Sequence, residues 1–226
     1  MATEVDIVNL ALAHLGDNAT VASLKPPEGS AQAEHAARFY PIARDTLLEA
    51  HGWNFATRRS SMALVTNPIA QWKYAYAVPN DCMDIIGVIS PVAESDYTTR
   101  ASASDSPNWG GSYSPSVSAG MYVPQPFTVE TDENGTPIVF TNVENALLRY
   151  QANVTDTAKF SAQFVFTLSW HLASMLAGPV IKGEVGQAEA KRCAQMMAAF
   201  LQTAKNADLA NRKIVLEHIV PWTAGR

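Results

Sequence analysis

Residues that could ligate a metal ion are spread thinly along this chain of 226 residues. Its five histidines show neither the i, i+4 pairing of a zinc-binding helix nor a neighbouring cysteine; they are His14, His35, His51, His171 and His218. The two cysteines, Cys82 and Cys193, lie far apart in unrelated surroundings, so the sequence predicts buried thiols rather than a metal pair or a disulfide. We therefore expect no metal and no cofactor, and we expect His171 to be a hydrogen-bonded histidine of a core or an interface.

Two further patterns favour ordinary structure over chemistry. Asp132-Glu133-Asn134-Gly135 lacks the alternating ligands and the later glutamate of a calcium loop, so it predicts a tight hairpin turn. The sequence has no GxSxG elbow, no glycine-rich phosphate loop and no local Cys–His signature. These observations predict a protein that is not an enzyme. Because catalytic residues can be distant in sequence, an enzyme stays an alternative.

The triplet Trp53-Asn54-Phe55 could stack on nucleic-acid bases, but only Arg58 and Arg59 accompany it. Packing in the core is the favoured interpretation, and the residues predicted as core anchors are Trp53, Phe55, Phe164 and Trp170. Arg44 and Asp45 are adjacent on a predicted helix, where neighbouring side chains point about 100° apart, so each is expected to pair with another residue.

The composition indicates a surface that other subunits cover. Apolar residues make up 47% of the chain and charged residues only 16%, which is charge-poor for a free surface. The formal net charge is −5 and no run of Lys or Arg occurs, which argues against a protein that grips nucleic acid. Residues 1–6 have no basic or apolar signal region, so we expect synthesis in a reducing cytoplasm.

One segment is long enough to be tested as a membrane helix. Residues 161–181 contain no Asp, Glu, Lys or Arg. Several polar side chains and the pair Gly178-Pro179, which is expected to break the helix, favour a buried helix instead, so no membrane partner is predicted.

The periodicity of the apolar residues and the positions of Pro, Asn and Gly between them predict two helices, then strands, then two more helices. Thr3 and Asp6 form a variant capping box for a helix ending near Leu15, with Val8, Leu12 and Leu15 on its core face and Gly16 at its end. Ser30 is predicted to cap a second helix that runs to about residue 51 and bends at Pro41. The later helices are expected at 158–179 and 187–211, the fourth with one face of small and apolar residues: Ala190, Ala194, Met197, Leu201 and Ala204.

Strands are predicted at 74–78, 84–89, 127–131, 138–141 and 146–152. The predicted fold is mainly α, a bundle of about four helices with an inserted small antiparallel β lobe. The helical bundle is expected to comprise residues 1–59 and 155–211, and the β lobe residues 60–154. Within the lobe, the Ser/Gly/Pro-rich stretch 98–126 is predicted to be a long loop that a neighbouring molecule orders.

Residues 212–226 are predicted to be a docking tail, because apolar side chains gather at a chain end. The residues expected to dock are Ile214, Val215, Leu216, Ile219, Val220 and Trp222.

Four stretches together resemble the head-to-tail adaptor family of tailed phages, which includes the podovirus tail tubular protein A group. They are the opening helix at 8–16, the run 32–56 that ends in Gly52-Trp53-Asn54-Phe55-Ala56, the strand motif at 74–82 that ends in Pro79-Asn80-Asp81-Cys82, and the aromatic helix at 158–179. The Ser/Gly/Pro-rich stretch 98–126 departs from the family pattern.

The resemblance implies a noncatalytic structural protein of the virion at the head-to-tail junction. It implies a closed ring of identical subunits, commonly twelve, that sits beneath the portal protein and above a downstream tail or nozzle protein, with DNA passing through its lumen without specific binding. The alternatives from other classes are a tail-associated enzyme that degrades cell wall or polysaccharide, and a virion accessory protein with no ring of its own.

Overall fold

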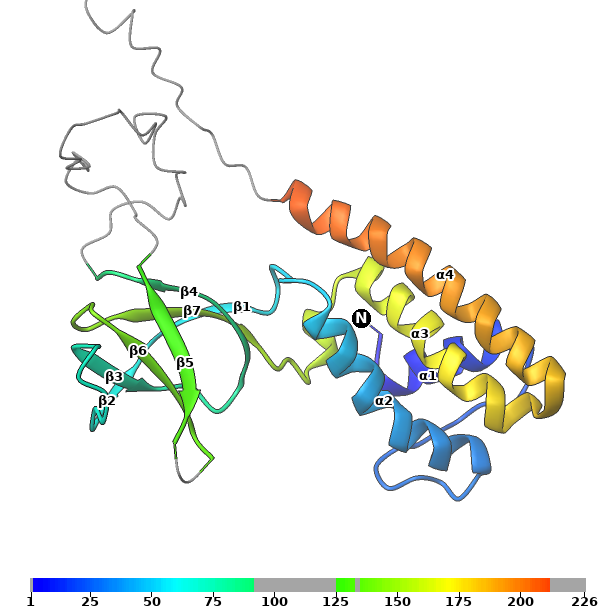
Figure 1. Cartoon of the computed structure of the whole chain (residues 1–226). Helices are drawn as coiled ribbons and strands as arrows, with labels where there is room; N and C mark the ends of the chain where they lie inside the picture. The colour runs from blue at the N-terminus through cyan, green and yellow to red at the C-terminus, as the bar shows by residue number, and fades with distance from the viewer. Residues whose placement is uncertain (1, 92–124, 133–134, 212–226) are drawn as a thin grey trace, which may run out of the picture. The chain divides into compact units, whose positions relative to one another are not determined.

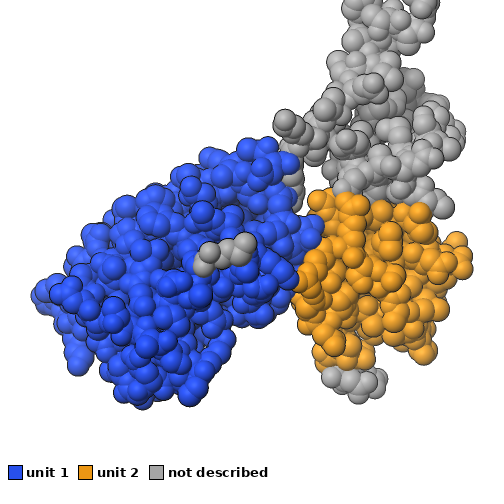
Figure 2. All heavy atoms as spheres, turned by 180° about the vertical axis from the view of Figure 1, so that it is seen from behind, with its two compact units in different colours: residues 1–57, 151–212 blue, residues 58–150, 213–226 orange. Residues whose placement is uncertain are grey.

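The computed structural model describes residues 2–91, 125–132 and 135–211. In these residues the chain forms four α-helices and two small antiparallel sheets (Figure 1). Contacts divide the chain into two compact units, with boundaries between Thr57 and Arg58 and between Tyr150 and Gln151. Figure 2 colours the two units separately. The predicted docking residues of 212–226, and residues 98–124 of the predicted loop, lie outside the described residues.

Helix α1 (Glu4–His14) begins at the predicted capping box. The Asp6 amide donates to Thr3 Oγ1 at 3.1 Å, and the Thr3 amide donates to Asp6 Oδ2 at 2.8 Å. The helix ends at His14, and Gly16 follows the C-cap residue Leu15 with a φ of 74°, in the left-handed region that glycine adopts without strain. Val8 and Leu12 are buried as predicted, whereas Leu15 is only half-buried because it is the C-cap residue.

Helix α2 (Ala31–Glu49) begins at the predicted cap, where Ser30 Oγ accepts from the Ala33 amide at 3.2 Å. The prediction that Arg44 and Asp45 find separate partners is wrong. Arg44 Nε and Nη2 each lie 2.8 Å from Asp45 Oδ1. Although the two Cβ atoms diverge, the long arginine side chain can fold back along the helix surface to reach its neighbour.

Helices α3 (Ala162–Ile181) and α4 (Gly183–Ala210) meet at Lys182, whose φ is 62°. The predicted break at Gly178-Pro179 is therefore wrong, and α4 begins earlier than predicted. Pro179 lies in the last turn of α3, where it removes a single backbone hydrogen bond, and the Lys182 amide still donates to Gly178 O at 3.0 Å.

Helix α3 is the central helix of the helical unit. It packs against α1, α2 and α4 (Figure 1), and nine of its residues are buried. By length and composition alone it is the one helix among the described residues that could cross a membrane, and half of its apolar window is buried inside the protein. Core helices of soluble proteins have the same properties.

Helix α4 contacts α3 through a narrow stripe on which Gly186, Cys193 and Ala204 are buried. Ala194 was predicted on this face and is exposed. The buried stripe advances by alternating steps of three and four residues, which places Cys193 rather than Ala194 against α3. Gly186 allows close approach, because a Cβ atom there would lie 2.9 Å from Ala177 O.

The β unit confirms the five predicted strands within a few residues and adds two short ones. The strands are β1 (Thr57–Ser61), β2 (Ala63–Val65), β3 (Tyr74–Ala77), β4 (Cys82–Ile89), β5 (Phe127–Thr131), β6 (Pro137–Thr141) and β7 (Leu147–Ala152). One sheet has the order β2-β3-β6-β5 with antiparallel pairs, and the other has the order β1-β7-β4.

The core of the four-stranded sheet is built on Ala75, Ile138 and Phe140. Strands β5 and β6 form the predicted antiparallel hairpin, and Gly135 in its turn has a φ of 80°. Asn134 of the predicted turn pair lies outside the described residues.

Candidate functional site

Trp53 is the centre of one aromatic cluster in the helical unit. Its side chain is fully buried, and its indole Nε1 donates to Leu47 O at 2.9 Å. The rings of Phe164 and Phe55 lie with their centroids 5.1 and 5.9 Å from that of Trp53. Phe164 is fully buried and Phe55 is half-buried. Three of the four predicted anchors therefore belong to one cluster.

The fourth predicted anchor, Trp170, lies in a second cluster where α1, α3 and α4 meet. His14 stacks on its ring with centroids 3.7 Å apart and an interplanar angle of 9°. The Arg192 guanidinium lies 5.6 Å from the Trp170 ring centroid, and Arg192 Nη2 donates to His14 O at 3.0 Å. Arg192 thus links α4 to the C-terminal end of α1.

The second cluster also contains a serine–histidine pair, the arrangement that a hydrolase would need. His14 Nε2 lies 3.0 Å from Ser169 Oγ. However, Ser169 is fully buried, and its hydroxyl donates to Phe166 O at 2.7 Å. A substrate has no access to this oxygen, so the pair is a packing contact rather than a nucleophile and its base.

The prediction that His171 is hydrogen-bonded is wrong for the described residues. Both its ring nitrogens, and the indole Nε1 of Trp170 beside it in sequence, are buried with no partner in the described part of the chain. Burial lowers the pKa of His171, and burial followed by the charge of Arg192 lowers the pKa of His14. Both shifts favour the neutral imidazole over the charged one.

These two histidines predict that the protein loses stability in mild acid. Their pKa values in the folded protein lie below the ordinary 6.5, so the unfolded chain takes up protons first as the pH falls. Their contribution is complete above pH 6.5 and is lost as the pH falls through the folded values. Urea unfolding at about pH 7.5 and pH 5.5 measures this loss.

The variant His171→Leu is the matched comparison. It should be more stable at neutral pH by about 1 kcal/mol, because it removes buried nitrogens that have no partner, and its acid dependence should be weaker. Asp6 and Glu28 do not interfere in this range, since their pKa values are lowered from 3.8 and 4.5. An unchanged pH profile in the variant would contradict the assignment.

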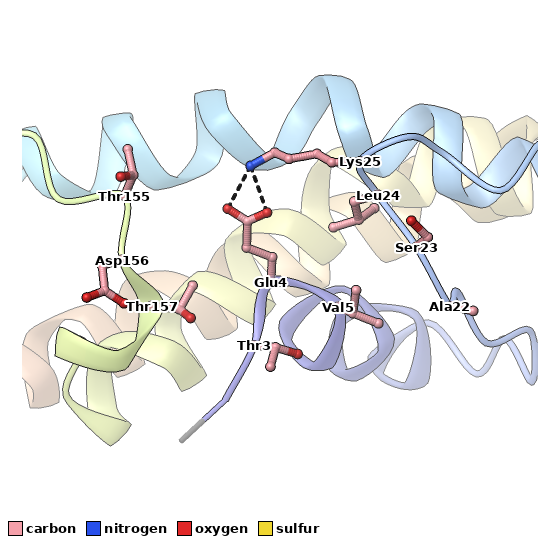
Figure 3. Close-up of a pocket in the computed structure, with 10 residues that line it drawn as sticks. All are labelled: Thr3, Glu4, Val5, Ala22, Ser23, Leu24, Lys25, Thr155, Asp156 and Thr157. Atoms are coloured by element: carbon pink, nitrogen blue, oxygen red, sulfur yellow. Dashed lines mark hydrogen bonds and ion pairs between the residues drawn. The ribbon is translucent and has the colours of Figure 1, made fainter.

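An open depression of about 440 Å³ lies at the start of α1 (Figure 3). It is lined by residues 3–5, 22–25 and 155–157, and Lys25 reaches across it to place Nζ 2.9 Å from Glu4 Oε2. This ion pair neutralises both charged groups, and the Thr3 hydroxyl is already used by the capping box. Ser23 donates to Pro26 O and Asp156 pairs with Lys159, so the hydroxyls of Thr155 and Thr157 are the polar side-chain groups of the lining left to orient a small ligand. Among the described residues no group of three or more His, Cys, Asp or Glu side chains could hold a metal ion.

Asp81, from the strand motif at residues 74–82, connects three segments of the β unit. Its carboxylate pairs with Arg58 and accepts from Tyr150 Oη at 3.0 Å. Cys82 beside it is half-buried rather than buried as predicted, and burial followed by nearby aspartates raises its pKa to about 11. A thiol with such a pKa is not a nucleophile at neutral pH.

Neither protein-family models nor curated proteins match this chain.

The side of α4 that faces away from α3 is exposed along the helix. It carries a stripe of exposed, uncharged side chains, here called the outward stripe: Ala188, Gln195, Ala199, Gln202 and Asn206. Two exposed apolar side chains flank it near the helix ends, Val185 at 67% exposure and Leu209 at 49%. The first half of this side also carries the exposed charged residues Glu184, Lys191 and Arg192, whereas residues 193–207 contain only the half-buried Lys205. Exposed helix faces normally carry charged residues, so the composition of the second half favours contact with another helix.

Proposed function

We propose that the protein is a structural subunit of a head-to-tail adaptor ring in a tailed bacteriophage. In this proposal identical copies form a closed ring, with twelve as the expected number, beneath the portal protein and above a downstream tail or nozzle protein. DNA passes through the lumen without specific binding, and the ring acts in the virion without catalysis, cofactor or membrane. The apolar tail of residues 212–226 docks on the portal or on a neighbouring subunit.

The observation that supports this proposal is the outward stripe of α4. A cyclic ring needs two different faces on each subunit, so that one copy offers a surface that the next copy covers. From Gln195 to Asn206 the outward stripe carries no charged side chain, and Ala199 in its middle is small enough for close helix contact. The low fraction of charged residues in the whole chain, 16%, fits a protein whose surface is largely covered.

A tail-associated hydrolase is the second candidate from another class. The buried state of Ser169 removes the one serine–histidine contact in the described residues that would have favoured it. Electron microscopy of the purified chain, alone and mixed with its portal protein, separates the two candidates. The proposal expects a ring of density below the portal, whereas a hydrolase would degrade peptidoglycan or polysaccharide without the portal.

A charge placed in the outward stripe should prevent assembly without unfolding the subunit. Ala199→Glu would bury an unpaired carboxylate in each contact between neighbouring copies, at a cost of roughly 3–5 kcal/mol. In the isolated subunit the same side chain stays in water, so the free energy of unfolding should change by less than about 0.5 kcal/mol. Ring formation on the portal and urea unfolding are the two measurements.

The matched control is Ala31→Glu, which adds the same carboxylate to an exposed alanine at the start of α2. We expect this variant to assemble normally. Normal rings formed by Ala199→Glu, or equal defects in both variants, would show that the outward stripe is not the contact between copies.

A further inference from the structure

The last turn of α4 is attached to the helical unit through one carboxylate. Asp208 Oδ1 and Oδ2 lie 3.1 and 3.2 Å from the Asn54 amide nitrogen, which donates to both, and Oδ2 lies 3.2 Å from His51 Nε2. The backbone oxygen of Asp208 also accepts from Asn54 Nδ2 at 2.6 Å. Segments 154 and 157 residues apart in sequence are thus joined at one residue.

Little else holds this end of the helix. Ala204 is the last buried residue of α4, and among the residues that follow it Asn206, Ala207, Leu209 and Ala210 are exposed. The Asp208 side chain, by contrast, is only 9% exposed. The final turns therefore gain almost no stability from apolar contact and depend on the polar contacts of Asp208.

The position of this aspartate is unfavourable unless local donors are present. A carboxylate in the last turn of a helix faces the negative end of the helix dipole, which costs about 0.3–1 kcal/mol. Two donors to the carboxylate, His51 Nε2 and the Asn54 amide, offset that cost, because hydrogen bonds to a charged group are stronger than neutral ones. Asn54 Nδ2 adds a hydrogen bond to the backbone oxygen of Asp208. These donors stand on a rigid base, since Trp53 between them is fully buried.

We propose that Asp208 is a conformational latch: while its carboxylate is held by His51 and Asn54, residues 205–211 are helical and docked, and when it is released they fray independently of the rest of α4. The latch thereby fixes the point from which the chain continues into residues 212–226. It does not depend on the proposed function, and it is tested on the full chain without a portal.

Hydrogen exchange measured peptide by peptide tests the latch. In Asp208→Ala the amides of residues 205–211 should exchange about tenfold faster or more, while protection of residues 186–204 stays the same. Asp208→Asn keeps the side-chain shape and one acceptor for the Asn54 amide, so it should have an intermediate effect. If Asp208→Ala does not fold, the exchange of residues 205–211 in Asp208→Asn tests the latch by itself.

Asn206→Gln is the matched control, because it changes an exposed side chain in the same turn and keeps the amide group that accepts from Gln202 Nε2. Its exchange in residues 205–211 should equal that of the parent chain. Unchanged exchange in both Asp208 variants would overturn the latch. Equal acceleration along the whole of α4 would also overturn it, because Asp208 would then support the helix as a unit rather than its end.

Discussion

Replacing Trp53 with alanine is expected to lower the free energy of unfolding by about 3–5 kcal/mol. The side chain is fully buried and packs against Phe55 and Phe164, so truncation removes a large apolar contact and leaves a cavity. It also leaves the Leu47 carbonyl, which accepts from the Trp53 indole at 2.9 Å, without its donor. Urea unfolding of the full chain measures the change.

Two comparisons make this result specific. Trp53→Phe keeps an aromatic ring and should cost clearly less than the alanine variant. Phe55→Ala should also cost less, because Phe55 is only half-buried. A Trp53→Ala protein with normal stability that had lost only an interaction with portal or DNA would contradict the core role and favour a surface role for the triplet.

Local signals at the helix starts could be predicted from the sequence because their causes are local. Thr3 with Asp6, and Ser30 before Ala33, satisfy free amides at a helix start, and each cap is formed by residues three positions apart. The hairpin of β5 and β6 follows the same logic, since the turn residues alone determine how the strands pair.

The predictions that were wrong assumed that a residue type has the same structural effect at every position. Pro179 breaks a helix only when enough helix follows it to be disrupted, and α3 ends at Ile181. Arg44 reaches its neighbour Asp45 because side-chain length, rather than the direction of the Cβ atom, decides which groups can meet. His171 was predicted to be a hydrogen-bonded core or interface histidine because no metal-binding pattern surrounds it, yet that absence carries no information about hydrogen-bond partners.

Hydrogen bonds and ring contacts between residues far apart in the chain could not be predicted from one sequence. Asp208 bonds to Asn54, and Arg192 contacts both His14 and Trp170, across more than 150 residues or between separate helices. Nothing in the local sequence of Asp208 or Arg192 distinguishes them from exposed helix residues. The one available signal was in the turn at residues 51–55, where a polar Asn54 between two aromatic residues needs hydrogen-bond partners of its own.

These contacts also give structural roles to polar residues of two sequence motifs. Asn54 of the Gly52-Trp53-Asn54-Phe55 run holds the end of α4, and Asp81 of the strand motif joins Arg58 to Tyr150. In each motif the polar residue organises the fold around it.

The second large effect is expected at the close approach of α3 and α4. Gly186→Ala should lower the free energy of unfolding by about 1–3 kcal/mol, because the new Cβ would lie 2.9 Å from the Ala177 carbonyl oxygen and backbone must move to accommodate it. The sign of this change separates packing from helix propensity. In an open helix position alanine is more favourable than glycine by up to about 1 kcal/mol, so a loss of stability indicates a steric cause. Thermal or urea unfolding measures the difference.

Gly178→Ala provides the opposite expectation in the neighbouring helix. Gly178 is exposed in the last turn of α3, and a Cβ atom there would meet nothing within 4 Å. This substitution should therefore leave stability unchanged or raise it by up to about 1 kcal/mol. Opposite signs at Gly178 and Gly186 would show that the contact between α3 and α4, rather than helix propensity, determines the need for glycine. If Gly186→Ala also stabilises the protein, the two helices do not pack as closely as the structure indicates, and the outward stripe of α4 would have to be reassigned.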